Sequence, residues 1–390
     1  MLNLHAKRKQ NPSIMKKLIT TLTLCTLVIT AFSCNNGKLN GNEPQTDTTE
    51  QEPEEHHLSL LIAGDLMQHG GQLKGALQAD GSYSYEECFR FVKPEIERAD
   101  VAIANFEVTL GGKPYKAYPQ FSAPDEFLKA TVDAGFDILL TANNHCLDTY
   151  QKGLERTIEL MDKLPVPHLG TYVNAEARRQ QYPFLLEKNG FRIVLLNFTY
   201  GTNGLKVTPP NIVNYIDTVE IKADIAKARQ MKPDFIIAIP HWGIEYQLLP
   251  SAEQKQLAEW LLKHGVDHII GGHPHVPQPI ELRNNGNTLV AYSLGNYISN
   301  QARPNTYGGV MVRMELSKKG NKAKLDNAGY CLYFVSRPAE SGRKNFRIYS
   351  INTPDSMLNA RERERRNTFA ASIRSLFKQH NKGNVKEYKF

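Results

Sequence analysis

Two histidines that stand one residue apart, His273 and His275, carry the first chemical signal in the chain. They lie in GGHPHVPQPIE (residues 271–281), directly after the apolar run VDHII. The run is typical of a buried strand, and the glycines and prolines after it predict a turn. Imidazole groups in such a turn can bind a metal ion or move protons. A surface turn that merely contains two histidines is the plainer interpretation, so the question is what else reaches the same place.

The same arrangement recurs from Leu58 onward, where short apolar runs are followed at once by polar side chains. These side chains include two acids, two amides and two further histidines, namely Asp65, Asn105, Glu107, Asn144, His145 and His241. Imidazole, carboxylate and amide oxygen are the usual ligands of hard or borderline divalent ions. The sequence therefore predicts a site for one or two divalent metal ions, with Mn, Zn, Fe and Mg all compatible.

The segments between the apolar runs have helical periodicity. Apolar residues recur at three- and four-residue spacing in SYEECFRFVKPEIERAD, GLERTIELMDKL, VEIKADIAKARQMK and AEQKQLAEWLLKHG. Strands that alternate with helices predict an α/β sheet, whose ligands bind beyond the carboxyl ends of the strands. Every polar cluster falls at such an end, so the predicted fold brings the candidate ligands together.

The composition is that of a globular protein, with 41% hydrophobic and 22% charged residues. The net charge of +7 is partly local, because residues 361–390 hold nine Lys and Arg against three Asp and Glu. We predict a basic C-terminal helix and tail over residues 353–390, with a solvated helix face as its first interpretation. Binding to an anionic polymer or lipid headgroup is the second. No nucleic-acid motif is present, and we expect no nucleic-acid partner.

The first 34 residues predict an export signal. MKKLITTLTLCTLVITAFSC (residues 15–34) has a short basic start, an apolar stretch and a cysteine after small residues, and Met15 is an alternative start. The end resembles a bacterial lipobox, so we predict lipidation of Cys34 and a lipid-anchored position in the cell envelope, outside the cytoplasm. An ordinary signal peptide with an incidental cysteine, or an uncleaved anchor, are the alternatives.

Residues 35–57 are polar and acidic and predict a disordered tether that holds the domain off a membrane. One large domain is expected over residues 58–352. Its three cysteines, Cys88, Cys146 and Cys331, have no metal-type spacing, and the sequence does not decide whether any of them forms a disulfide.

Six motifs, in order, resemble those of one known family. GDLM, NFEVTL, TANNHCLD, PHWGIEY, GGHPHVPQPIE and YSLGNYISNQ look like the motif set of the CapA family of poly-γ-glutamate capsule synthesis proteins (PGA_cap), which is similar to the calcineurin-like metallophosphoesterases. The resemblance runs from about Leu58 to Gly309. It implies a metallophosphatase-like four-layer α/β/β/α sandwich. It also implies a role in capsule or other envelope-polymer biosynthesis or export.

The resemblance implies a role for each residue of the predicted site. Asp65 and His275 would bind a first metal, Glu107 would bridge, and Asn144, His241 and His273 would bind a second. His145 would be the proton donor to a leaving group. Asp148 would either orient His145 or cap the helix that follows.

Four further residues are candidates for substrate binding: Asn105, Glu245, Gln278 and Asn296. Glu245 could instead support His241 or be a solvated turn residue. Gln278 could simply complete its loop, and Asn296 could belong to a tight turn.

Two departures from the metallophosphoesterase pattern bear on function. Met67 stands where those enzymes have a second ligand, and NFE replaces their GDxxD motif. The expected activity is metal-dependent hydrolysis of a phosphoester or an amide. The alternative is a non-catalytic module that binds an anionic polymer at a degenerate metal site. The expected partners are such a polymer or a phosphoester, the membrane through the lipid anchor, and the capsule-synthesis machinery.

Overall fold

The computed structural model describes residues 54–164 and 166–390. The predicted signal peptide, Cys34 and residues 35–53 of the predicted tether lie outside the described residues. Strand β1 begins at Glu55 and pairs with Lys319 of β14 there. Residues 55–57 therefore belong to the sheet, and the boundary predicted at residue 58 was wrong by three residues.

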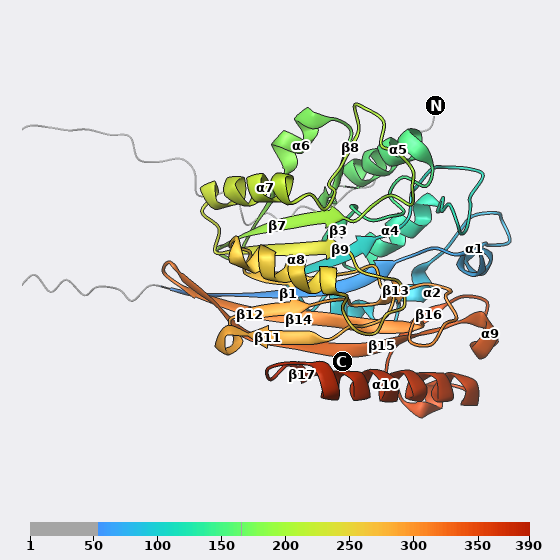
Figure 1. The fold of residues 1–390 in the computed structure, drawn as a ribbon. Coiled ribbons are helices and arrows are strands. Elements are labelled where there is room, and N and C mark those ends of the chain that lie inside the picture. The colour runs from blue at the N-terminus through green and yellow to red at the C-terminus, as the bar shows by residue number, and fades with distance from the viewer. Residues whose placement is uncertain (1–53, 165) are drawn as a thin grey trace, which may run out of the picture. The chain divides into compact units, whose positions relative to one another are not determined.

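Two large sheets form the centre of the fold (Figure 1). The nine-stranded sheet has the order β16-β15-β14-β1-β2-β3-β4, with β13 beside β1 and β17 beside β15. Its strands are β1 (Glu55–Leu66), β2 (Val101–Phe106), β3 (Ile138–Leu140), β4 (His168–Leu169), β13 (Asn296–Ile298), β14 (Gly308–Lys319), β15 (Lys322–Ser336), β16 (Arg347–Ser350) and β17 (Lys386–Glu387).

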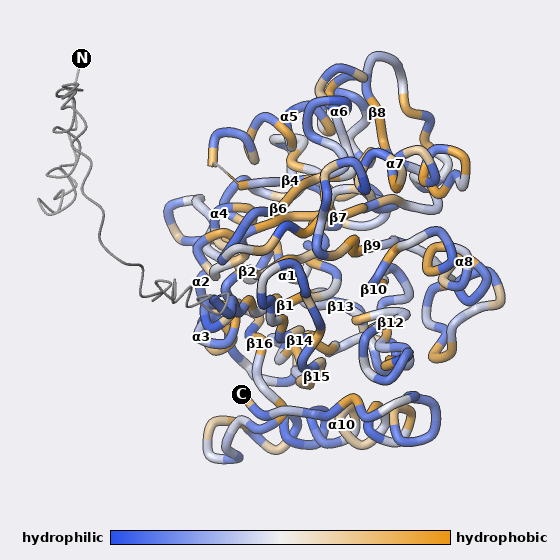
Figure 2. Tube along the Cα trace, turned by 90° about the vertical axis from the view of Figure 1, so that its left-hand side faces the viewer, coloured by the Kyte–Doolittle hydropathy of each residue, from blue (hydrophilic) through white to orange (hydrophobic). Residues whose placement is uncertain are grey.

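The six-stranded sheet has the order β11-β12-β10-β9-β7-β6. Its strands are β6 (Phe184–Lys188), β7 (Phe191–Thr199), β9 (Phe235–His241), β10 (His268–Ile270), β11 (Ile280–Arg283) and β12 (Thr288–Ala291). A small third sheet pairs β5 (Thr171–Tyr172) with β8 (Ile212–Val213). In Figure 2 the central strands β7 and β9 are mostly orange, as expected of strands buried on both faces.

Helices cover the outer face of each sheet. They are α1 (Gly70–Ala76), α2 (Glu86–Phe89), α3 (Lys93–Ile96), α4 (Asp125–Asp133), α5 (Tyr150–Lys163), α6 (Ala175–Gln181), α7 (Thr218–Gln230), α8 (Ala252–Lys263), α9 (Pro338–Ser341) and α10 (Ala360–His380), with 3₁₀ turns η1 (Asn284–Gly286) and η2 (Asp355–Met357). The helix predicted over SYEECFRFVKPEIERAD is instead the pair α2 and α3. Pro94 lies in the first turn of α3, and a proline cannot continue the helix before it.

The alternation of β1 shows how the layers are built. Leu60 and Ile62 join one buried cluster, whereas Leu61 and Ala63 join another on the opposite face of the same strand. The first cluster also contains the apolar residues of the six-stranded sheet and of α7 and α8, and the second contains those of α2, α3 and α4. The predicted α/β sandwich of two sheets between helices is therefore confirmed.

Helix α10 packs on the nine-stranded sheet and is part of the same compact unit, which spans Glu52–Phe390. Phe369, Ile373 and Phe377 are buried, and the Phe377 ring meets Tyr330 of β15 edge-on at 4.9 Å. Several of its arginines pair with nearby acids, as Arg374 does with Glu387. The helix is thus an added element of the sandwich (Figure 1), and only one side of it is the solvated face expected from its charge.

Two further points concern the described residues alone. None of their helices is long and apolar enough to cross a membrane. Cys88, Cys146 and Cys331 are buried and unpaired, so no disulfide forms among the three.

Candidate metal centre

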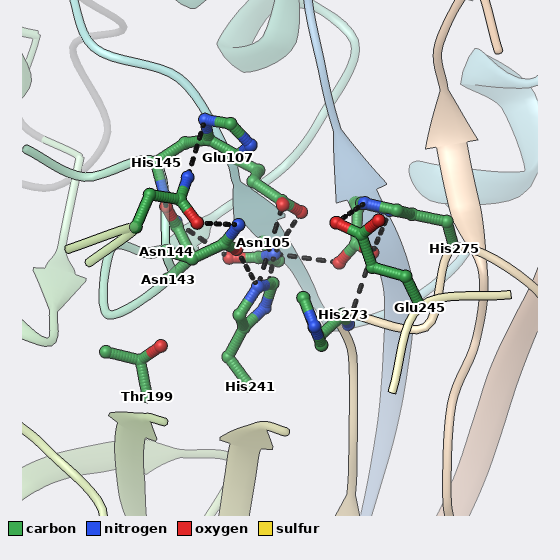
Figure 3. A network of polar contacts seen from close by, with 12 residues as sticks. Asn105, Glu107, Asn143, Asn144, His145, Thr199, His241, Glu245, His273 and His275 are labelled. Atoms are coloured by element: carbon green, nitrogen blue, oxygen red, sulfur yellow. Dashed lines mark hydrogen bonds and ion pairs between the residues drawn. The ribbon is translucent and has the colours of Figure 1, made fainter. Parts of the chain in front are cut away.

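The candidate ligands come together at the carboxyl ends of the central strands, as predicted (Figure 3). The residues are Asp65 at the end of β1, Asn105 in β2, Glu107 just after it, Asn144 and His145 after β3, His241 at the end of β9, and His273 and His275 after β10. Strand pairing sets Asp65 opposite Asn105 and His241 beside Gly272. All eight side chains are buried.

The loop after β10 adopts an unusual backbone to present its histidines. His273 has φ 99° and His275 has φ 60°, both in a region that L-residues rarely occupy. Such positions cost on the order of 1–3 kcal/mol each and persist where the surroundings demand them. Gly272 is needed beside them, because a Cβ there would lie 2.9 Å from Asp65 Oδ1. The fold therefore accepts strain in order to place two imidazoles against Asp65 and Glu107.

Two overlapping sets of ligand atoms could each hold a cation. One set is Asp65, Glu107 and His241, and the other is Glu107, His273 and His275, with the atoms of each set within 4.8 Å of one another. Glu107 belongs to both, as a bridging carboxylate would. The sets combine the histidines differently from the family-based expectation, which placed His273 with His241 and His275 with Asp65.

The residues present fit a divalent metal ion. Glu107 Oε1, His273 Nδ1 and His275 Nδ1 are buried and have no hydrogen-bond partner. Buried polar atoms are nearly always paired, so these three atoms, which belong to the residues of one ligand set, fit a bound cation. Asn144 Oδ1 lies 2.6 Å from His241 Nε2, so it accepts a hydrogen bond when that nitrogen is protonated, and the two atoms could otherwise bind a common cation.

Burial sets the charge of the ligands. Loss of water and the nearby Asp65 carboxylate raise the pKa of Glu107 well above its ordinary value. Burial and the neighbouring imidazoles lower the pKa of His241 and His273 well below theirs. Both shifts favour the neutral imidazole, which is the form that binds metals. A cation would relieve the unfavourable burial of the carboxylate.

His145 is held by Asp148 beside the ligand sets. His145 Nδ1 lies 2.7 Å from Asp148 Oδ2, which also accepts a hydrogen bond from the backbone N–H of Phe121 at 2.7 Å. The cap of α5 is Thr149, and Asp148 forms no bond to that helix. Of the two predicted roles of Asp148, the orienting one agrees with these contacts. The Phe121 ring lies 4.6 Å from the ring of His145 and limits its movement.

The four predicted substrate-binding residues separate into two pairs. Asn105 lies among the ligands. The partly exposed Glu245 comes within 4.0 Å of His275, whereas support of His241 was one of its two alternative roles. The buried Gln278 is occupied in holding a loop, because its amide donates to the carbonyls of Gln247 and Leu249.

The buried Asn296, the fourth of these residues, is likewise engaged in structure. Its amide donates to Gln301 Oε1 at 3.0 Å and to the carbonyl of Thr306 at 2.8 Å. Its Oδ1 is buried without a partner. Asn296 pairs with Asp65 in the register of β13 and β1, so it helps to hold the strand that carries Asp65.

Three residues near the centre were not predicted from the sequence. The half-exposed Tyr200 ring lies 4.4 Å from that of His273, and Asn203 accepts a hydrogen bond from Asn144 at 3.1 Å. His69 stacks edge-on with Phe121 at 5.0 Å, and burial together with His275 lowers its pKa to about 4. Tyr200 and Asn203 follow the apolar run of β7, so the strand-end pattern could have found them. His69 lies in the turn into α1 and has no such signal.

A sandwich of two sheets with buried acids and imidazoles at its strand ends defines an α/β protein with a candidate metal centre. The model of the bacterial capsule synthesis protein family PGA_cap matches residues 59–301. Because this match covers more than half of the chain, the chain belongs to that family, and the predicted resemblance is confirmed.

Similar proteins include two with curated names. The chain is 30% identical over 317 residues to the capsule biosynthesis protein CapA of Bacillus anthracis, covering 77% of this chain and 74% of that protein. It is 29% identical over 271 residues to the PGA biosynthesis protein CapA of Bacillus subtilis (strain 168), covering 67% and 69%.

Similar solved structures include the calcineurin-like phosphoesterase YfkN of Bacillus subtilis, with 16% identity and a TM-score of 0.46 over 84% of this chain and 99% of that one. A putative 5'-nucleotidase from Staphylococcus aureus has 12% identity and a TM-score of 0.47 over 81% and 58%.

Glu107→Gln should increase the free energy of unfolding of the metal-free protein, and this increase should become larger as the pH rises. The folded state raises the pKa of Glu107, so the unfolded chain releases this proton first, and stability is lost as the pH rises through the folded pKa. Glutamine does not titrate, so its free energy of unfolding does not fall in this way. The difference between variant and parent should therefore increase by up to about 1.4 kcal/mol per pH unit. Urea unfolding of chelator-treated protein at several pH values measures this.

The exposed Glu364 of α10 provides the control, because Glu364→Gln changes the same charge in water. The free energy of unfolding of Glu364→Gln should change with pH in the same way as that of the parent. A Glu107→Gln curve that also runs parallel would show that burial of the carboxylate is not unfavourable.

Proposed function

We propose that this protein is a metal-dependent hydrolase of capsule or other envelope-polymer biosynthesis, acting on a phosphoester or an amide. The observation that carries the proposal is the buried ligand set around Glu107, with three unpartnered atoms, beside the oriented pair His145 and Asp148. The names of the two CapA relatives support the polymer context. The metal is one or two divalent ions of Mn, Zn, Fe or Mg.

The residues divide the chemistry between them. A divalent cation in this site supplies Lewis acidity and makes water more acidic. Asp65, Glu107, His241, His273 and His275 are the residues that would hold it, with Asn144 beside them. His145 donates a proton to the leaving group from Nε2, because Nδ1 faces the Asp148 carboxylate. Tyr200 and Glu245 are partly exposed and lie next to His273 and His275, respectively.

The test is hydrolysis by the purified full-length chain in detergent. p-Nitrophenyl phosphate, its bis-ester and γ-glutamyl-p-nitroanilide serve as substrates, before and after chelation. We expect activity on at least one, lost on chelation, restored by Mn, Zn, Fe or Mg, and absent in a His273→Ala, His275→Ala double variant. Bound metal without any hydrolysis would favour the alternative, a non-catalytic module, which binding of poly-γ-glutamate would then test.

Removal of the proton donor should affect poor leaving groups most. His145→Asn should lower kcat by about 10²–10⁴ for an alkyl phosphate, because an alkoxide needs a proton as it departs. The loss should be much smaller for p-nitrophenyl phosphate, whose phenolate is a good leaving group. The kcat of Asp148→Asn should lie between those of His145→Asn and the parent. The metal content of both variants should equal that of the parent. Equal losses on both substrates would contradict this role.

Anchoring in the cell envelope is part of the proposal and depends on the lipobox-like sequence that ends in Cys34. A lipid there would place the centre near membrane-associated polymer and the machinery that makes it. Cys34→Ser should move the protein expressed in a bacterial host from the membrane fraction to the soluble fraction. Mass spectrometry should find a diacylglyceryl group on the parent alone, and a parent without it would overturn the anchor.

A further inference from the structure

Asn105 places its amide nitrogen at the centre of one of the two ligand sets. Nδ2 lies 2.8 Å from Asp65 Oδ1, 3.2 Å from Glu107 Oε2 and 3.2 Å from His241 Nδ1 (Figure 3). These are the three residues of the set Asp65, Glu107 and His241. The nitrogen carries two hydrogens and faces three acceptors, so each ligand residue of this set already meets a positive partial charge.

Neighbouring residues determine the orientation of this amide. Asn105 Oδ1 accepts a hydrogen bond from Asn143 Nδ2 at 3.1 Å. Asn143 is oriented in turn, because its Nδ2 also donates to the Phe106 carbonyl and its Oδ1 accepts from the backbone N–H of His145. A flipped Asn105 would turn its oxygen toward two carboxylates and its NH₂ toward another NH₂. The nitrogen therefore faces the ligands.

The second ligand set differs from the first because three atoms of its residues receive no hydrogen bond. Glu107 Oε1, His273 Nδ1 and His275 Nδ1 have no hydrogen-bond partner, although all three are buried. The backbone at His273 and His275 adopts positive φ to bring these imidazoles to Glu107. One set thus receives hydrogen bonds from a neutral side chain, and the other fits a cation.

We propose that this chain binds a single divalent cation, between Glu107, His273 and His275, because the amide of Asn105 takes the place of a second ion. The proposal rests on the proposed function in so far as that function requires a metal. It departs from the expectation of one or two ions by assigning a single ion and the residue that prevents another.

The charge of the centre supports a single ion. Asp65 and Glu107 are the carboxylates among the ligand residues, and their two negative charges balance one divalent cation. Asp148 is engaged by His145, and Glu245 is partly exposed at the edge. A second divalent ion would leave two positive charges uncompensated in a buried site, which is strongly unfavourable. A carboxylate in place of Asn105 would halve this excess charge and would also remove the blocking NH₂ group.

The test is the metal content of the full-length chain, reconstituted with Mn²⁺ after chelation and freed of loosely bound ions. The parent should bind one equivalent, and Asn105→Asp should bind two, because the substitution removes the NH₂ group and adds a carboxylate ligand beside Asp65 and Glu107. Electron paramagnetic resonance gives a second readout, because an isolated Mn²⁺ has a six-line signal and a pair of ions has an exchange-coupled one. The parent should show the first signal and Asn105→Asp the second.

Asn203→Asp is the matched control. Asn203 is exposed, touches Asn144 and has φ 50°, which aspartate also tolerates, so the change adds the same charge at the edge of the centre. It should keep one equivalent and the six-line signal. Two equivalents in Asn203→Asp would mean that charge alone recruits the second ion, and the role of the Asn105 amide would be overturned.

The parent decides the outcome even if Asn105→Asp fails to fold. Two equivalents or a coupled signal in the parent overturn the single-ion proposal and leave the hydrolase proposal intact. One equivalent in both the parent and folded Asn105→Asp overturns the role of Asn105. One bound ion without hydrolysis contradicts the proposed function alone, and a parent that binds no Mn²⁺ overturns both.

Discussion

The centre depends on one unfavourable arrangement, a carboxylate removed from water and set close to a second one. Glu107 is fully buried and lies with Asp65 in the same ligand set. Such a group must be neutralised by a proton, a hydrogen-bond donor or a cation. The Asn105 amide donates to one of its oxygens, and the other has no hydrogen-bond partner. The chain thus keeps an energetically unfavourable buried carboxylate at a position where a bound cation would neutralise it. Sites that serve function rather than stability often have this property.

The sandwich explains how this arrangement is maintained. Asp65, Asn105 and His241 stand on strands that are hydrogen-bonded to their neighbours and packed on both faces, so their side chains have little freedom to move apart. His273 and His275 come from a loop instead, but its backbone is pinned by the Asp65 carboxylate, which accepts from the His273 N–H at 3.3 Å. Rigid strands and a strained loop together produce a preorganised ligand set.

The departures from the metallophosphoesterase pattern acquire a physical meaning in this setting. Met67, where a second ligand is usual, is buried in the apolar cluster beneath α2 and α3. The carboxylate of the second motif stands at Glu107, and Asn105 fills the space beside it. A centre with fewer anionic ligands balances less positive charge.

The sequence by itself determined the alternating strands and helices and the identity of the polar residues at the strand ends. Both follow from local patterns, because hydrophobic periodicity and turn residues are read within a few positions. It could not show that Pro94 divides a helix in two, or that Gln278 and Asn296 are occupied in holding loops and strands. Only the tertiary structure decided that Glu245 approaches His275, that Asp148 orients His145, and that Asn105 turns its nitrogen to the ligands. These contacts join residues from separate elements, and their geometry depends on how the two sheets pack.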